Sequence, residues 1–199
     1  MALISCQKII AVYGFLGSGK TTVMMALARD IVAGGHRAAV VVNEAGDVPV
    51  DGKWLMTSGL PVKEIFGGCI CCSVMGDFIT TLRALTKEPS LDTILIEPSG
   101  MADAPQLFGS IEKHIGLPVL KVLVLDAPRL SLLLKAAALL IRSQLEAADI
   151  ILLNKTDTLT PDQLAKTRHM IPRQKNTPAI LDTAAANGLP VALIEDILK

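Results

Sequence analysis

Residues 14–22 read Gly-Phe-Leu-Gly-Ser-Gly-Lys-Thr-Thr and directly follow the short apolar run at residues 9–13. Glycines at this spacing let a backbone loop wrap a polyphosphate, with its amide hydrogens pointing inward at the start of a helix. The Lys20 ammonium can reach the β- and γ-phosphates, and the Thr21 hydroxyl can coordinate Mg²⁺. A glycine-rich turn without a ligand is the alternative, but the spacing and the strand-loop-helix context both favour a phosphate loop. The residues expected to bind nucleotide phosphates are Gly14, Gly17, Ser18, Gly19, Lys20, Thr21 and Thr22.

Short apolar runs alternate with longer helical segments along the chain. The runs predict strands at residues 9–13, 38–42, 93–97, 120–125 and 150–153, and the segments between them predict helices at residues 20–33, 75–85, 129–147 and 161–170. Each run is apolar along its length, as in strands that are buried on both faces. This order predicts an α/β fold of the P-loop NTPase class, with a mostly parallel sheet and helices on both faces. Since ligands bind beyond the carboxyl ends of such strands, one crevice is expected to collect Gly14, Asn43, Glu97, Asp126 and Asn154.

Length and composition narrow the class of protein. The chain has 199 residues, 51% of them hydrophobic, which predicts a single domain over residues 1–199. Lysine plus arginine and aspartate plus glutamate each total 19, so no global field favours nucleic acid or an anionic membrane. The N-terminal apolar run is too short to span a membrane, and a signal-peptide pattern is absent, so we expect a cytoplasmic protein. In that reducing compartment clustered cysteines indicate metal or redox chemistry rather than disulfides.

Residues 150–157 read Ile-Ile-Leu-Leu-Asn-Lys-Thr-Asp and indicate which base is bound. The Asp157 carboxylate can accept hydrogen bonds from the ring N–H and the exocyclic amine of guanine, whereas adenine presents an acceptor in place of that ring donor. Sites that need such bonds discriminate by about 10⁴ or more, because the wrong ligand leaves a buried polar group unpaired. Asn154 can donate nearby, and Lys155 can lay its methylene stem across the base. A solvated loop is the alternative for this short pattern, but its place after an apolar strand favours guanine.

Residues 97–100 read Glu-Pro-Ser-Gly and end another predicted strand. Nucleotide hydrolases of this class place an acid here toward Mg²⁺ and the γ-phosphate, and Gly100 leaves room for its amide to approach that phosphate. An acidic residue at a simple Pro-Ser-Gly turn is the alternative. Upstream, the acidic segment at residues 43–51 lies where a switch loop would sit. Glu44, Asp51 and Gln106 are each candidates for positioning the attacking water.

Residues 67–72 read Gly-Gly-Cys-Ile-Cys-Cys and hold three of the four cysteines of the chain. Thiolates are soft ligands that suit Zn²⁺, and Cys69, Cys71 and Cys72 leave one tetrahedral position for water, another side chain or a recipient protein. An open position is what metal delivery requires. Cysteines packed as small hydrophobic residues, or a redox pair, are the alternatives. Affinity alone does not decide between Zn²⁺, Co²⁺ and Ni²⁺ as the physiological metal.

Together these motifs, with Asn-Glu-x-Gly at residues 43–46, resemble the CobW-like GTPases, metallochaperones related to the urease and hydrogenase maturation GTPases. The resemblance implies slow GTP hydrolysis to GDP with Mg²⁺, coupled to metal insertion into a recipient protein or a cobalt cofactor pathway. It implies that Glu97 stands where other GTPases carry aspartate. The catalytic residues expected from the motifs are Lys20, Thr21, Glu44 and Glu97, with Thr21 and Glu97 at Mg²⁺. Two departures stand out. Family members usually carry Phe where this chain has Ala45, and their separate C-terminal domain is expected to be absent.

The position of the cysteines between the switch candidate and Glu97 suggests how the two sites communicate. We hypothesise that GTP and Mg²⁺ order residues 43–51 and the cysteine segment together, and that hydrolysis relaxes both. A nucleotide-binding metal or redox sensor that delivers nothing is the alternative. A small-molecule kinase is disfavoured because Asn154 to Asp157 indicate guanine. A second copy of the chain, bound in a nucleotide-dependent dimer, is a further candidate partner.

Overall fold

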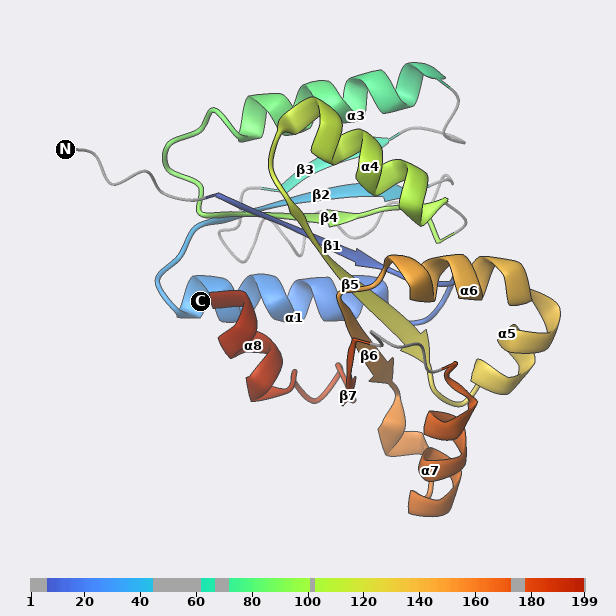
Figure 1. Cartoon of the computed structure of the whole chain (residues 1–199). Helices are drawn as coiled ribbons and strands as arrows, with labels where there is room; N and C mark the ends of the chain where they lie inside the picture. Colours follow the sequence, from blue (N-terminus) through green and yellow to red (C-terminus); the bar gives the residue numbers. More distant parts are fainter. Residues whose placement is uncertain (1–6, 45–61, 67–71, 101–102, 173–177, 199) are drawn as a thin grey trace.

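The computed structural model describes residues 7–44, 62–66, 72–100, 103–172 and 178–198. Its centre is a seven-stranded sheet with the strand order β3-β2-β4-β1-β5-β6-β7, in which every neighbouring pair is parallel (Figure 1). The strands are β1 (Lys8–Tyr13), β2 (Ala38–Glu44), β3 (Val62–Phe66), β4 (Thr93–Glu97), β5 (Val119–Asp126), β6 (Ile150–Asn154) and β7 (Ala179–Asp182). The helices are α1 (Lys20–Ala33), α3 (Cys72–Leu85), α4 (Ala104–Ile115), α5 (Leu130–Ala136), α6 (Ala138–Ala147), α7 (Pro161–Met170) and α8 (Val191–Leu198), with the 3-10 turn η1 (Thr156–Thr158).

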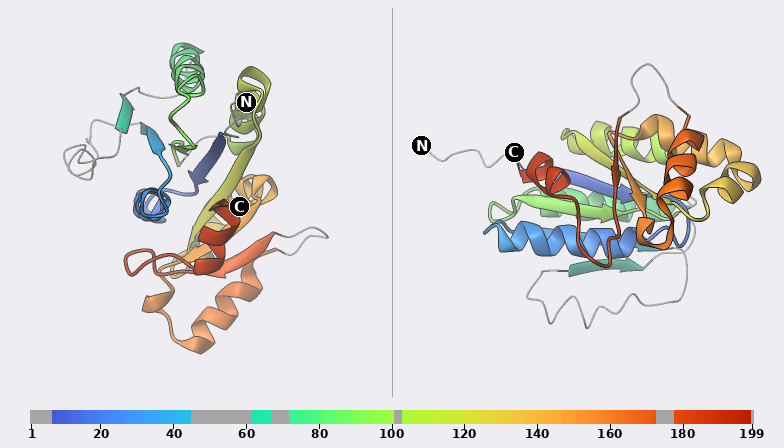
Figure 2. Two further views of the ribbon diagram at one scale, coloured as in Figure 1. Left: turned by 90° about the vertical axis from the view of Figure 1, so that its left-hand side faces the viewer. Right: turned by 90° about the horizontal axis from the view of Figure 1, so that it is seen from below.

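Helices cover both faces of the sheet, as the sequence predicts. In Figure 1, α3 and α4 lie on one side of the strands and α1 and α8 on the other, and the left view of Figure 2 shows the same separation from a further direction. Successive residues of β1 point to opposite faces: Ile9 and Tyr13 join the core beneath α3, α4 and α6, while Ile10 and Val12 join the core against α1 and α8. This arrangement explains why the predicted strands are apolar along their whole length.

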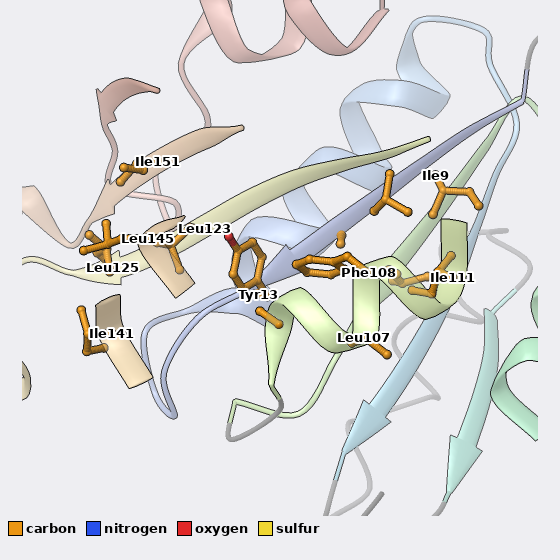
Figure 3. Close-up of a cluster of buried hydrophobic side chains, with 14 of the residues drawn as sticks. Ile9, Tyr13, Leu107, Phe108, Ile111, Leu123, Leu125, Ile141, Leu145 and Ile151 are labelled. Carbon is orange, nitrogen blue, oxygen red and sulfur yellow. The ribbon is translucent and has the colours of Figure 1, made fainter. Parts of the chain in front are cut away.

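The larger core contains a pair of aromatic rings at the carboxyl end of β1. Figure 3 shows Tyr13 and Phe108 side by side among leucine and isoleucine side chains. Their ring centroids are 5.0 Å apart at an interplanar angle of 76°, which is the edge-to-face geometry that aromatic rings favour. Phe108 belongs to α4, so this contact joins that helix to the last residue before the glycine-rich loop.

Two predicted helices differ from the observed ones, and four observed elements, β3, β7, α4 and α8, were not predicted. The single helix expected at residues 129–147 is wrong: α5 and α6 are separate helices, because Ala137 leaves the helical region with φ −136° and ψ 40°. The break lets Leu133 of α5 and Ile141 of α6 reach one core from helices that run in different directions. The helix expected at residues 75–85 begins earlier, at Cys72. Two strands, β3 and β7, were not expected, and both lie at the edges of the sheet.

The order of the strands produces a crevice at one end of the sheet. Strand β1 lies between β4 and β5, and the chain leaves β1 through α1 toward β2, on the far side of β4. Connections therefore diverge from β1 in opposite directions, which opens a space beyond its carboxyl end. The glycine-rich loop begins at this point. In the part of the chain that the structure describes, no helix combines the length and the apolar character needed to cross a membrane.

Candidate nucleotide site

The loop between β1 and α1 has the backbone of a phosphate-binding loop. Gly14, Gly17 and Gly19 have φ values of 143°, 72° and 96°, which side chains other than glycine rarely adopt. A Cβ atom at Gly14 would overlap the carbonyl oxygen of Val124, so glycine is also required there by space. Within the loop, the Ser18 amide donates to the Phe15 carbonyl at 3.1 Å.

Helix α1 starts without a side chain that caps its first turn. Its N-cap is Gly19, and its first turn contains no acidic residue. The N–H groups at a helix start carry a partial positive charge, which an anion stabilises. Lys20, the first residue of α1, is buried and adds a full positive charge. This end of the helix is therefore suited to bind phosphate.

Glu97, the last residue of β4, lies directly beside the start of α1. The Thr21 hydroxyl donates to Glu97 Oε1 at 3.1 Å, and Lys20 Nζ lies 3.9 Å from the same oxygen. A hydroxyl and a carboxylate at this separation form a hard oxygen donor set that fits Mg²⁺. The structure thus brings together Lys20, Thr21 and Glu97, as predicted for the cation and phosphates.

Gly100 packs against the phosphate loop. A Cβ atom there would lie 3.0 Å from the Leu16 nitrogen, 3.1 Å from the Gly14 oxygen and 3.3 Å from Lys20 Nζ. These distances are shorter than ordinary van der Waals contacts, so even a methyl group would push the loop away. Glycine therefore allows the segment after β4 to lie against the phosphate site.

Gln144 of α6 is a residue of this site that sequence reasoning missed. Its Nε2 donates to the Gly100 carbonyl at 3.3 Å, and its backbone carbonyl accepts the Tyr13 hydroxyl at 2.7 Å. Burial, and secondly the charge of Asp149, raise the pKa of Tyr13 well above its usual value, so its hydroxyl stays a donor. Gln144 is 1% exposed, and its Oε1 has no hydrogen-bond partner among the described residues. A buried glutamine within the apolar pattern of α6 was the available signal.

Asn154, the last residue of β6, bridges the phosphate loop and the segment after β7. Its Nδ2 donates to the Ser18 carbonyl at 2.9 Å, and its Oδ1 accepts from the Ala185 amide at 3.0 Å. Both partners are backbone groups, and Asn154 is 3% exposed. Asn154 therefore holds two loops in place, while Asp157, in the turn η1, is exposed at the edge of the site.

Lys155 and Asp126 complete the link between the base segment and the phosphate loop. Lys155 Nζ lies 2.7 Å from the Gly17 carbonyl and 2.7 Å from Asp126 Oδ2. Burial of Asp126 would raise its carboxyl pKa, but hydrogen bonds from Lys155 and Arg129 outweigh burial and bring the pKa below its usual value. Asp126 is therefore a charged carboxylate inside the site. The convergence predicted for the ends of β1, β4, β5 and β6 is found here.

The remaining predicted residues are only partly within the described residues. Glu44 ends β2, Cys72 begins α3, and their side chains lie outside the described part, as do Cys69 and Cys71 altogether. Asp51 also lies outside it, whereas Gln106 is exposed in the first turn of α4. Over the described ranges, no group of three or more His, Cys, Asp or Glu side chains could hold a metal ion.

Known sequences resemble this chain over most of its length. The sequence pattern of the CobW/HypB/UreG nucleotide-binding domain matches residues 8–181. The zinc chaperone YeiR of Escherichia coli is 40% identical over 154 residues, which cover 75% of this chain and 46% of YeiR. The zinc chaperone CobW of Pseudomonas aeruginosa is 30% identical, over 98% of this chain and 60% of that protein. The chain thus spans about half the length of these relatives.

Solved structures share the fold. HypB from Helicobacter pylori, in complex with nickel, superposes with a TM-score of 0.64 at 17% identity, covering 97% of this chain and 84% of HypB. FlhF complexed with GTP and Mg²⁺ gives a TM-score of 0.60 at 14% identity, covering 89% of this chain and 66% of FlhF. These likenesses show that the chain shares their overall fold.

Proposed function

Because the chain belongs to the CobW/HypB/UreG family of nucleotide-binding domains, we propose that it is a GTPase that binds a transition metal and transfers it to a recipient protein. The observation that supports this most directly is the Thr21–Glu97 hydrogen bond at the foot of a preformed phosphate loop. It joins a hydroxyl and a carboxylate where the β- and γ-phosphates of a nucleotide would enter.

Each residue of the site has a distinct task in GTP binding. Lys20 and the first amides of α1 hold the β- and γ-phosphates, and Gly100 leaves space beside the γ-phosphate. Asp157 accepts the two guanine donors, and the stem of Lys155 covers one face of the base. The contacts with the phosphates orient the γ-phosphoryl group for attack by water and exclude bulk solvent.

Hydrolysis requires stabilisation of negative charge and a positioned water. Thr21 and Glu97 would hold Mg²⁺, which supplies positive charge to the phosphate oxygens. Lys20 adds its own charge on the γ-phosphate. Glu44, at the carboxyl end of β2, is the proposed residue for orienting the water. In the absence of a partner or metal we expect a slow rate, as in other GTPases that lack a stimulating group.

The cysteine segment is proposed to bind the metal. Cys69, Cys71 and Cys72 supply three thiolates, which suit Zn²⁺ and also accept Co²⁺ or Ni²⁺. Zinc is favoured because the relatives YeiR and CobW are named zinc chaperones. In the sheet, Glu44 pairs with Phe66, so β3 ends, directly before the cysteine segment in the sequence, beside the first residues of the switch candidate. This adjacency supports coupling of metal binding to the nucleotide.

One titration series tests the whole proposal. Zn²⁺ binding is measured with GDP and with a non-hydrolysable GTP analogue, on the wild type and on the Cys69→Ser, Cys71→Ser, Cys72→Ser triple variant. We expect the triple variant to lose one equivalent of Zn²⁺ while its GTP affinity, measured without Zn²⁺, stays that of the wild type. The Zn²⁺ affinity of the wild type should differ between the nucleotides, and by linkage Zn²⁺ should change GTP affinity by the same factor.

The outcomes separate this proposal from its alternatives. Full Zn²⁺ stoichiometry in the triple variant would rule out the cysteine site. Equal Zn²⁺ affinities with the two nucleotides would rule out coupling. A wild type that binds Zn²⁺ with nucleotide-dependent affinity, but does not release it to an apo-acceptor on hydrolysis, would indicate a sensor.

A further inference from the structure

Two cationic side chains hold the outer side of the phosphate loop. Arg129 Nη2 donates to the Leu16 carbonyl at 3.0 Å, and Lys155 Nζ donates to the Gly17 carbonyl at 2.7 Å. Both cations also reach one carboxylate oxygen, Asp126 Oδ2, at 2.8 Å from Arg129 Nε and 2.7 Å from Lys155 Nζ. Asp126 ends β5, and its side chain is 1% exposed. A rigid strand therefore carries the anchor for both cations.

Bonds from Arg129 and Asn154 to loop carbonyls determine how two peptides of the loop are turned. In a trans peptide the carbonyl and the following N–H point in opposite directions. The bond from Arg129 to the Leu16 carbonyl therefore turns the Gly17 N–H toward the side of the loop away from Arg129. The bond from Asn154 to the Ser18 carbonyl acts in the same way on the Gly19 N–H. Phosphate loops bind their ligand through amides turned in this manner.

Arg129 lies directly against the loop and cannot be replaced by an equivalent cation. A Cβ atom at Gly17 would lie 2.9 Å from Arg129 Nη2, so glycine at this position makes room for the guanidinium. The Arg129 backbone amide also donates to Asp126 Oδ1 at 3.1 Å, which holds the other end of the residue. A guanidinium bonds the carboxylate through Nε and the loop through Nη2 with two nitrogens held in one plane, whereas a lysine at position 129 would have to make both contacts from one nitrogen.

Lys155 shows that the network acts on the base segment as well. Among the described residues it is the one non-glycine residue with positive φ, at 64°. Such a backbone costs about 1 kcal/mol or more and persists when surrounding contacts impose it. Here the contacts are those of its ammonium with Asp126 and Gly17. The conformation of the base segment therefore depends on the same carboxylate that holds Arg129.

We propose that Arg129 is a positioning residue for nucleotide binding, and that Asp126 couples it to Lys155 so that the phosphate loop and the base segment form one unit. This inference rests on the guanine nucleotide site proposed above. A loop that already has its phosphate-binding conformation loses less conformational entropy when phosphates bind. Removal of Arg129 should therefore weaken binding of GTP and GDP alike.

The test measures equilibrium affinity for GDP on the full chain. In Arg129→Gln we expect GDP to bind about threefold to tenfold more weakly, which corresponds to the net strength of one ordinary hydrogen bond, because the side chain is half-exposed. Arg129→Lys should recover part of the loss. Arg142→Gln, which removes an exposed arginine from the neighbouring helix α6, should bind GDP as the wild type does.

A double variant tests the coupling through Asp126. Asp126→Asn keeps the shape of the side chain but removes the charge that orients both cations. Because Arg129 would then be poorly oriented, adding Arg129→Gln to Asp126→Asn should weaken GDP binding by less than Arg129→Gln does in the wild type. Independent, multiplicative effects would overturn the coupling.

Steady-state GTP hydrolysis separates positioning from a structural role. Loss of binding energy shared by substrate and transition state raises KM and leaves kcat unchanged. A variant that merely unfolds in part would instead show lower kcat with an unchanged KM. Wild-type affinity for GDP in Arg129→Gln would overturn the inference while the proposed function stood. A wild type that binds no guanine nucleotide would overturn the proposed function itself.

Discussion

Thr21 and Glu97 are 76 positions apart in the sequence and are joined by a 3.1 Å hydrogen bond. Thr21 belongs to the first turn of α1, and Glu97 is the last residue of β4, the strand next to β1. The bond therefore places a carboxylate from one strand at the phosphate end of a helix that follows the neighbouring strand. The Mg²⁺ and phosphate contacts proposed for these residues would therefore fall at a single location.

Glu97→Gln removes the charge of this carboxylate while keeping its shape. We expect Mg²⁺-supported GTP hydrolysis to fall by about 10²-fold or more, a typical cost of removing one preorganised electrostatic group. Hydrolysis rates over a Mg²⁺ titration measure the effect. Glu146→Gln, at an exposed position of α6, is the matched control. A rate within twofold of the wild type at every Mg²⁺ concentration would show that the carboxylate has no role at the cation.

Gly100→Ala introduces a methyl group against the phosphate loop. Since its Cβ would lie 3.0 Å from the Leu16 nitrogen, we expect weaker binding of a GTP analogue and slower hydrolysis, each by about tenfold or more. Gly109→Ala in α4 is the control, because a Cβ there meets nothing within 4 Å. That control should raise stability by about 0.5–1 kcal/mol through better helix propensity. Equal GTP affinity in the two alanine variants would contradict the close approach of Gly100.

Asp157→Asn should change the base that is preferred. Xanthine carries a carbonyl where guanine carries its exocyclic amine, so an asparagine amide can donate where the aspartate accepts. We expect the ratio of GTP to XTP affinity to fall by at least about 10²-fold, as in other sites that require specific hydrogen bonds. Competition binding with both nucleotides measures it. Asp162→Asn in α7, also exposed, should keep the preference of the wild type, and unchanged selectivity in Asp157→Asn would exclude this residue from base recognition.

Asp126 should make stability depend on pH in the acid range. Its folded pKa lies below the usual 3.8, because hydrogen bonds from Lys155 and Arg129 outweigh burial. A carboxyl with a depressed folded pKa stabilises the fold above the unfolded pKa, and this stability is lost as the pH falls through the folded pKa. The free energy of unfolding of the wild type, measured with denaturant, should thus decrease as the pH falls below about 4. Asp126→Asn should show a shallower decline, and identical slopes would contradict the shift.

The central elements were predictable from the sequence, and the edge elements were not. Strands β4 and β6 have every residue buried, and β1 has every residue buried except Lys8, so their apolar runs are continuous. Edge strand β7 is half-buried, and β3 reads Val-Lys-Glu-Ile-Phe, so neither has such a run. Helix α4 could have been found from Asp103 at its N-cap, Pro105 in its first turn and Gly116 at its end.

The candidate site divides in the same way. Residues with their own sequence motifs, such as Lys20 and Asn154, were predicted because phosphate and guanine recognition require specific groups at specific spacing. Arg129 and Gln144 have no motif around them. Arg129 contacts Leu16 and Gln144 contacts Gly100, and both contacts join residues that are distant in the sequence and meet only in the folded protein.

The sequence alone determined the parallel α/β architecture, the phosphate loop and the residues suited to guanine, because local spacing and strand burial impose them. The tertiary structure decided which side chains support that loop. Strand order places β4 on one side of β1 and β5 and β6 on the other. It thereby brings Glu97, Asp126 and Asn154 together at the carboxyl ends of the central strands. Contacts between segments so distant in the chain depend on that order, which no local pattern encodes.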